Sequence, residues 1–204
     1  MGPTPPVTAE YTSALQGPQP NVPPVQSAYR FCRATDGKTR VDTGNTSVIS
    51  NPATGQTILL DHVKKTATIH PASPTAPPGA PQMPHFSAPG LPGMPHAPSV
   101  QVQDLGKSVF QGQEVEGKRF LIQPHAMPKT PGVPKPPKAP TVAEVWTSSE
   151  LRVPMHINMS GGFGQVTQVC KSAVSGEPHP STFQIPSNYK MVTVPLKPPI
   201  AAGH

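Results

Sequence analysis

The distribution of proline constrains the fold of this chain more than any other feature, because proline lacks the backbone N–H that strands and helices use. Ten of the 32 prolines fall in residues 71–98, and seven more fall in residues 124–140. Both segments favour extended polyproline II geometry over regular strands or helices. The ordered structure therefore has to come from the rest of the 204 residues.

Residues 100–124 lie between the two proline-rich segments and carry the clearest strand pattern. Apolar residues such as Val102 and Phe120 recur within it at spacings of two, which is typical of strands. Gly112 and Gly117 bracket two acidic residues and indicate turns. The pattern predicts a pair of hairpin strands at the centre of the ordered domain.

Similar alternation elsewhere predicts further strands joined by tight turns, of which Asp36-Gly37 is the clearest. Short connections between such strands favour an antiparallel, up-and-down arrangement. The only tryptophan, Trp146, is expected to fill the core with its indole N–H bonded at the rim. Additional strands are expected at residues 28–34, 38–42, 46–50, 56–60, 65–70, 141–153, 155–159 and 165–173.

These patterns predict an all-β fold with a single antiparallel sheet and long proline-rich arms. The expected β domain covers residues 28–190, with proline-rich insertions at 71–99 and 124–140. Residues 1–27 are expected to be a proline-rich N-terminal arm, and residues 191–204 a C-terminal tail. Aromatic residues make up only 5% of the chain, so its core must be modest.

The net charge of +6 comes from few charges, since only 13% of the residues are charged. The densest basic group, Lys129, Lys135 and Lys138, lies in the second proline-rich segment. Proteins that bind nucleic acids usually gather their cations with aromatic residues on one surface. The sequence therefore predicts no nucleic-acid partner, and favours contact of this basic arm with an acidic protein or an anionic membrane surface.

No residue pattern predicts catalysis. Gly112 to Lys118 reads G-x-x-x-x-G-K, but Arg119 stands where a phosphate-binding loop needs Ser or Thr. A strand is expected after it, whereas a phosphate site needs the N-terminus of a helix. The eight histidines lie mostly beside prolines or at strand ends. We therefore expect neither an enzyme nor a bound cofactor.

A near-repeat of Met-Pro-His occurs twice, eleven residues apart, at Met83–His85 and Met94–His96. Thioether and imidazole groups suit Cu(I). The neighbouring prolines hold these side chains on extended chain, however, so contact with a protein partner is favoured over a metal site. The predicted partner-binding residues are Met83, His85, Phe86, Met94, His96, Lys129, Lys135 and Lys138.

The two cysteines, Cys32 and Cys170, fall on different expected strands. Their spacing is compatible with one disulfide and equally with two buried thiols, because the sequence does not supply the geometry. No stretch approaches the roughly 20 apolar residues that a membrane-spanning helix needs. No signal peptide is visible at the start of the sequence.

A set of short segments occurs in a specific order along residues 28–190, namely 29–30, 36–40, 51–55, 59–61, 105–107, 112, 115–117, 144–151 and 178–189. Taken together, these segments resemble a family of exported bacterial β-rich proteins of unknown function. That family is similar to the half-barrel lipoprotein carriers of the LolA type, which have one curved antiparallel sheet with an apolar concave face. The resemblance implies a curved, half-barrel-like sheet without catalytic residues, and a periplasmic or exported location.

Two functions are compatible with this reading of the sequence. The first is a non-catalytic accessory or scaffold subunit that packs its sheet and proline arms on a larger protein assembly, including a membrane-bound one. Polyproline segments suit this function because they are already extended and cost less to order. The second is a carrier of a lipid or acyl chain in the concave face. That cavity is expected to be lined by Phe31, Ile58, Phe120, Ile122 and Trp146.

Overall fold

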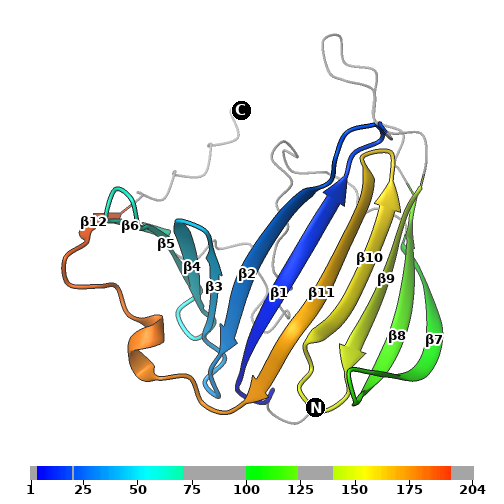
Figure 1. The fold of residues 1–204 in the computed structure, drawn as a ribbon. Coiled ribbons are helices and arrows are strands. Elements are labelled where there is room, and N and C mark those ends of the chain that lie inside the picture. The colour runs from blue at the N-terminus through cyan, green and yellow to red at the C-terminus, as the bar shows by residue number, and fades with distance from the viewer. Residues whose placement is uncertain (1–3, 20, 71–99, 124–139, 194–204) are drawn as a thin grey trace, which may run out of the picture. The chain divides into compact units, whose positions relative to one another are not determined.

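The computed structural model describes residues 4–19, 21–70, 100–123 and 140–193. The described residues form twelve strands and one short 3-10 helix, so the predicted all-β class is confirmed. The strands are hydrogen-bonded as a single sheet in the order β12-β6-β5-β4-β3-β2-β1-β11-β10-β9-β8-β7 (Figure 1). The predicted single sheet is therefore confirmed as well.

Most strands begin and end close to the residues where the alternation predicts them. β3 to β6 form the expected up-and-down meander with β2, and β7 and β8 form the central hairpin. The elements are β1 (Val7–Gln16), β2 (Val25–Arg33), β3 (Thr39–Thr43), β4 (Thr46–Asn51), β5 (Gln56–Asp61), β6 (Thr66–His70), β7 (Val100–Phe110), β8 (Gln113–Ile122), β9 (Thr141–Ser148), β10 (Pro154–Gly161), β11 (Gly164–Ser175), η1 (Pro180–Phe183) and β12 (Lys190–Thr193).

The expected N-terminal arm is wrong for residues 7–16, which form the ten-residue strand β1. Val7, Ala9 and Tyr11 alternate along β1 and are buried. The prolines of this region flank the strand without entering it, so its backbone N–H groups are available for pairing. The ordered part of the chain therefore starts well before residue 28.

The expected strand over residues 141–153 ends early, at Ser148. The backbone then turns, because the Ser148 hydroxyl accepts a hydrogen bond from the Leu151 N–H at 3.1 Å. Leu151 and Val153 are buried although they lie outside any strand. Their apolar character reflects a buried loop, which the alternation alone cannot distinguish from a strand.

The last strand breaks the antiparallel pattern. β12 pairs in parallel with β6, with Lys190 opposite Thr66 and Thr193 opposite Ile69. A parallel pair needs a long connection, and here β12 is separated from β6 by most of the chain. The expectation of a wholly antiparallel sheet is wrong for this pair.

The chain divides into two compact units. The described residues of unit 1 are 4–9, 29–70 and 174–193, and those of unit 2 are 10–19, 21–28, 100–123 and 140–173. Each unit has its own buried side chains, so each is described separately below.

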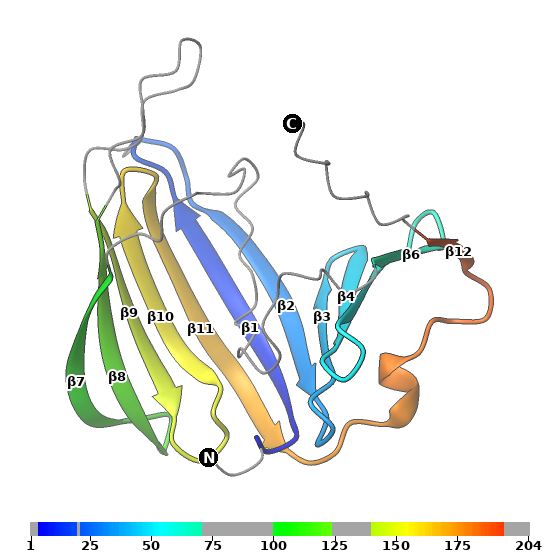
Figure 2. The same cartoon turned by 180° about the vertical axis from the view of Figure 1, so that it is seen from behind.

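The core of unit 1 lies on the meander and is covered by the segment between β11 and β12. Ile49, Leu60 and Ala67, from β4, β5 and β6, are buried. Phe183 and Tyr189 of the covering segment pack against this cluster together with Ile58 and Ile185. This segment also carries η1, which contacts β3 and leads around to β12 (Figure 2).

In unit 2, a glycine that the sequence suggests as a turn residue lies in the middle of a strand. Gly117 is part of β8, directly opposite Trp146 of β9. A Cβ atom added at Gly117 would lie 2.5 Å from Cζ3 of the Trp146 ring. The half-buried indole therefore lies against the glycine backbone, which only a residue without a side chain permits.

We predict that Gly117→Ala lowers the free energy of unfolding by about 1–3 kcal/mol, because the new methyl group overlaps the indole ring. In a Trp146→Leu background the same substitution should cost clearly less, since the clashing ring is gone. Urea denaturation followed by far-UV circular dichroism measures both losses. Equal losses in the two backgrounds would show that the indole is not the obstacle.

Candidate binding surfaces

The predicted partner-binding residues lie outside the described residues, and their role stays a prediction. They belong to the segments 71–99 and 124–139. The candidate surfaces that follow come from the described strands. The residues concerned are Met83, His85, Phe86, Met94, His96, Lys129, Lys135 and Lys138.

The side chains predicted to line a lipid cavity do not share one surface. Directly opposed residues in a sheet point to the same face, and neighbours along a strand point to opposite faces. Trp146 is opposite Gly117, whereas Phe120 is opposite Ala143. Because residues 117 and 120 are three positions apart on β8, Trp146 and Phe120 lie on opposite faces. The proposed lining set is therefore wrong.

One face of unit 2 carries a continuous apolar row across five neighbouring strands. Each member of the row is the direct cross-strand partner of the next. Neighbouring strands lie about 4.8 Å apart, so the row is about 19 Å long. We call it the apolar row, and its members are Val102, Phe120, Ala143, Met159 and Val166.

The apolar row is partly open to solvent. Val102, on the edge strand β7, is 59% exposed, and Phe120, Met159 and Val166 are half-buried. Among the described elements of unit 2, β8 contacts β7 on one side and β9 on the other, and β9 also contacts β10. Covering a sheet face of this composition with another surface is favourable, because it removes apolar side chains from water.

The other face of unit 2 carries Trp146 and is more polar. His156 and Val169 continue the row that starts at Trp146, and the His156 ring stacks on Phe110 with centroids 5.9 Å apart. A parallel row holds an ion pair in which Arg119 Nη2 lies 2.7 Å from a Glu144 carboxylate oxygen. We call this surface the tryptophan face.

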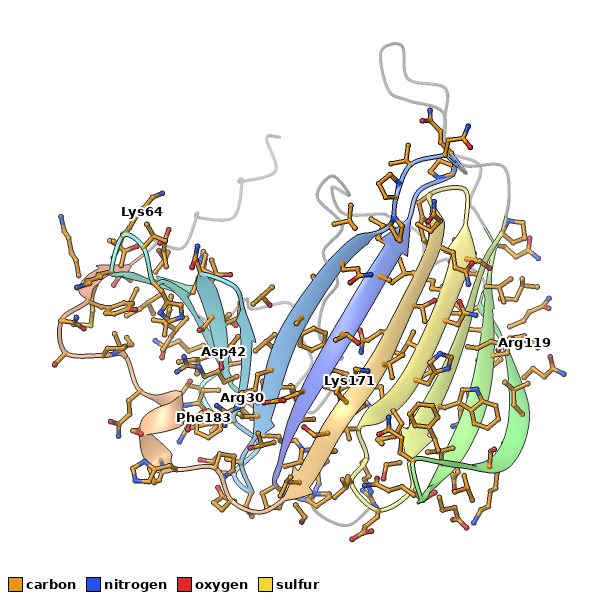
Figure 3. All side chains as sticks on the ribbon, viewed as in Figure 1. Arg30, Asp42, Lys64, Arg119, Lys171 and Phe183 are labelled. Carbon is orange, nitrogen blue, oxygen red and sulfur yellow. The ribbon has the colours of Figure 1, made fainter. Side chains whose placement is uncertain are left out.

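A groove of about 570 Å³ lies on the tryptophan face over β1, β2 and β11. Small side chains, including Ala14, Ala28 and Thr12, form it because none of them fills the space above the sheet. Its cation is Lys171, which lies beside β1 (Figure 3). Sequence reasoning missed this groove, because small residues on strands carry no distinctive pattern. The residues that line it are Thr12, Ser13, Ala14, Gln26, Ser27, Ala28, Thr167, Val169 and Lys171.

Unit 1 contains a chain of hydrogen bonds that involves a serine, a histidine and an aspartate. The Ser47 hydroxyl lies 2.5 Å from Asp42 Oδ1 and 2.6 Å from His62 Nε2. On its other side, His62 Nδ1 lies 2.5 Å from the Tyr189 hydroxyl. Arg40 donates to Asp42 and, through Nη1, to the Thr182 carbonyl at 2.8 Å.

This network holds the covering segment on the meander. Tyr189 and Thr182 both belong to that segment, and the network ties them to β3, β4 and the residue after β5. Ser47 is only 1% exposed, and its hydroxyl lies between Asp42 and His62. A nucleophilic serine needs an open path to substrate and a histidine between serine and acid. The arrangement here is therefore structural.

The glycine-lysine motif at residues 112–118 is part of a hairpin. Gln111 and Gly112 both have positive φ, at 51° and 79°, and form the two-residue turn between β7 and β8. β8 follows directly, in place of the helix that a phosphate site requires. The structure agrees with the sequence argument against phosphate binding.

Cys32 and Cys170 are buried free thiols in the structure. The Cys170 Sγ donates to the Ser172 carbonyl at 3.3 Å. Burial raises the pKa of the Cys170 thiol, and contacts with the Ser172 backbone and the Tyr11 side chain partly oppose this rise.

Within residues 4–19, 21–70, 100–123 and 140–193, no three His, Cys, Asp or Glu side chains are grouped as metal ligands. Over the same residues, no helix has the length and apolar character to cross a membrane.

Comparison with protein-family models gives no match, and no curated protein sequence matches the chain either. Solved structures do match. A structure of MucB in complex with MucA(peri) is 10% identical, covers 94% of this chain and has a TM-score of 0.50. This chain spans 58% of that MucB chain, less than two thirds of its length.

Two further solved structures match with lower TM-scores. The Mycobacterium tuberculosis lipoprotein LppX is 13% identical, with 84% of this chain and 87% of that chain covered and a TM-score of 0.35. A LolA superfamily protein from Nitrosomonas europaea is 8% identical, with 90% and 91% covered and a TM-score of 0.30. The solved structures that match this chain thus include a LolA superfamily protein, at low identity.

We predict that the stability difference between the wild type and Cys170→Ala shrinks as the pH rises from neutral to alkaline. Because the thiol pKa is higher in the folded state, the unfolded chain releases this proton first, and unfolding becomes easier above the ordinary thiol pKa. The alanine variant lacks that contribution. Urea denaturation of both proteins across this range measures the difference, and a constant difference would contradict the raised pKa.

Proposed function

We propose that this chain is a non-catalytic binding subunit that packs the apolar row of unit 2 against a partner protein. The single observation that carries the proposal is the row itself, which is apolar across five strands and partly exposed. Phe120, the second residue of the row, is the kind of aromatic anchor that dominates interface energies. The proposal also includes contact of the proline-rich arms with the partner and an exported location for the protein.

A protein fits this face better than a small molecule does. Small-molecule sites are concave pockets, and the groove of unit 2 lies on the opposite, tryptophan face. A standard interface buries about 800 Å² on each partner, which a row about 19 Å long can anchor with its flanking residues. The similarity in fold to MucB, whose structure contains MucA(peri), supports a protein partner.

Site-specific photo-crosslinking in the native cells tests the proposal. A photoreactive amino acid at Phe120 or Met159 points to the face of the apolar row and should capture one and the same partner protein. The adjacent positions Leu121 and Asn158 point to the tryptophan face and serve as matched controls, because neighbours on a strand face opposite ways. Mass spectrometry identifies the captured protein.

The proposal is judged by which face of the sheet captures the partner protein. Capture of one protein from positions 120 and 159, and its absence at 121 and 158, supports binding through the apolar row. Capture from both faces equally, or only from positions 121 and 158, would remove the proposed interface. Circular dichroism of each labelled protein confirms that the sheet is intact.

The groove on the tryptophan face favours a second candidate, carriage of an acyl chain with an anionic head group. Its volume of about 570 Å³ falls within the range of roughly 300–1,000 Å³ that is usual for ligand sites. The lining is made largely of small residues, and Lys171 supplies a cation for a carboxylate or phosphate. This candidate uses different residues from the cavity expected from the sequence.

Binding of a fluorescent fatty acid tests the second candidate. Ala28→Trp should fill the groove and abolish binding, and Lys171→Glu should weaken binding of the fatty acid more than that of the matching neutral alcohol. Lys118→Glu removes an exposed cation from the opposite face and should change neither affinity. Unchanged binding by Ala28→Trp would show that the probe does not occupy the groove.

A further inference from the structure

The strand β7 ends the sheet and presents a long unpaired edge. It pairs with β8 on one side, and no described strand lies on its other side (Figure 1). Its eleven residues include Val102 at 59% exposed and Val109 at 71% exposed. Exposed strand edges pair readily with further strands unless charges or bulges prevent it.

An irregularity in β7 places two opposite charges on one face. Asp104 is opposite Lys118 and Lys107 is opposite Glu116, with a register shift between Asp104 and Gly106. In a regular strand, residues three positions apart, such as 104 and 107, point to opposite faces. The bulge between them changes this relation. With it, both share the face of the apolar row.

We propose that two copies of this chain pair antiparallel through β7, with the two-fold axis between Leu105 and Gly106. In this register Val102 lies opposite Val109 of the second copy, and Asp104 lies opposite Lys107 of the second copy. The symmetry generates each pair twice. Two ion pairs at the centre are therefore flanked by two apolar pairs, and all four residues are exposed in the single chain.

The charges select this register over its neighbours. A two-fold axis through residue 104 would place Asp104 against its own copy, and an axis through residue 107 would do the same for Lys107. Like charges directly opposite each other destabilise a strand pair, whereas opposite charges stabilise it. Only a register centred between the two charges makes both contacts favourable.

The present contacts of the two charges leave them able to pair. Asp104 Oδ1 accepts the Gly106 N–H at 2.7 Å, which leaves Oδ2 available. Lys107 Nζ lies 3.0 Å from a Glu114 carboxylate oxygen in an exposed pair, and an ammonium group can donate to more than one acceptor. A bulge usually protects an edge strand, because it spoils pairing with a regular strand. In the proposed register the bulges of the two copies lie opposite each other at the axis, so the residues on either side of them remain in register.

Charge-reversal variants of the full chain test the dimer. Asp104→Lys alone and Lys107→Glu alone each place like charges across the axis, so each should raise the dimer dissociation constant at least about tenfold relative to the wild type. Mixed in equal amounts, the two variants should associate with each other about as well as the wild type associates with itself. Analytical ultracentrifugation measures all three equilibria.

Lys171→Glu is the matched control, because it reverses an exposed charge on β11, four strands away from the edge strand β7. It should change the dissociation constant by no more than about threefold. A wild type that stays monomeric at high concentration would overturn the proposal, and so would a mixture that associates no better than the separate variants. Neither result bears on partner binding through Phe120 and Met159, which lie on β8 and β10, away from the edge.

Discussion

An apolar sheet face has to be removed from water, and this chain meets that requirement differently in its two units. In unit 1 the segment between β11 and β12 folds back over the meander, so that Phe183 and Tyr189 cover Ile49, Leu60 and Ala67. Hydrogen bonds from Arg40 and His62 fix that segment in place. Unit 1 thus supplies its own cover.

Unit 2 presents the same problem without a described element on its apolar row. The row includes Phe120 and Met159, which remain half-buried. Taking such a side chain from fully exposed to fully buried is favourable by about 1.5–3 kcal/mol, and part of this free energy is still to be gained here. This difference between the units is the reason for placing the binding function in unit 2. A partner protein on the row would play the part that the chain's own covering segment plays in unit 1.

Local chemistry made much of the fold predictable from the sequence. Alternation and turn residues located the meander and the central hairpin, because both depend on near neighbours in the chain. The partnership of His62 with Tyr189 joins residues far apart in sequence, and no local pattern indicates it. The role of Gly117 was missed for the same reason, since it depends on Trp146 of another strand. For the candidate site, residues such as Phe120 and Trp146 could be recognised by their type. The face of the sheet on which each lies could be assigned only from the register of the strands.

The bulge in β7 has a consequence for how the surface of this chain can vary. Deleting residue 105 would make the pairing of β7 with β8 regular, because Asp104, Gly106 and Lys107 already lie opposite three consecutive residues of β8. Asp104 and Lys107 would then be two positions apart and would stay on one face. The bulge therefore lets the hairpin differ by one residue in length at this position, while its pattern of charge and valine stays on the same face of the sheet.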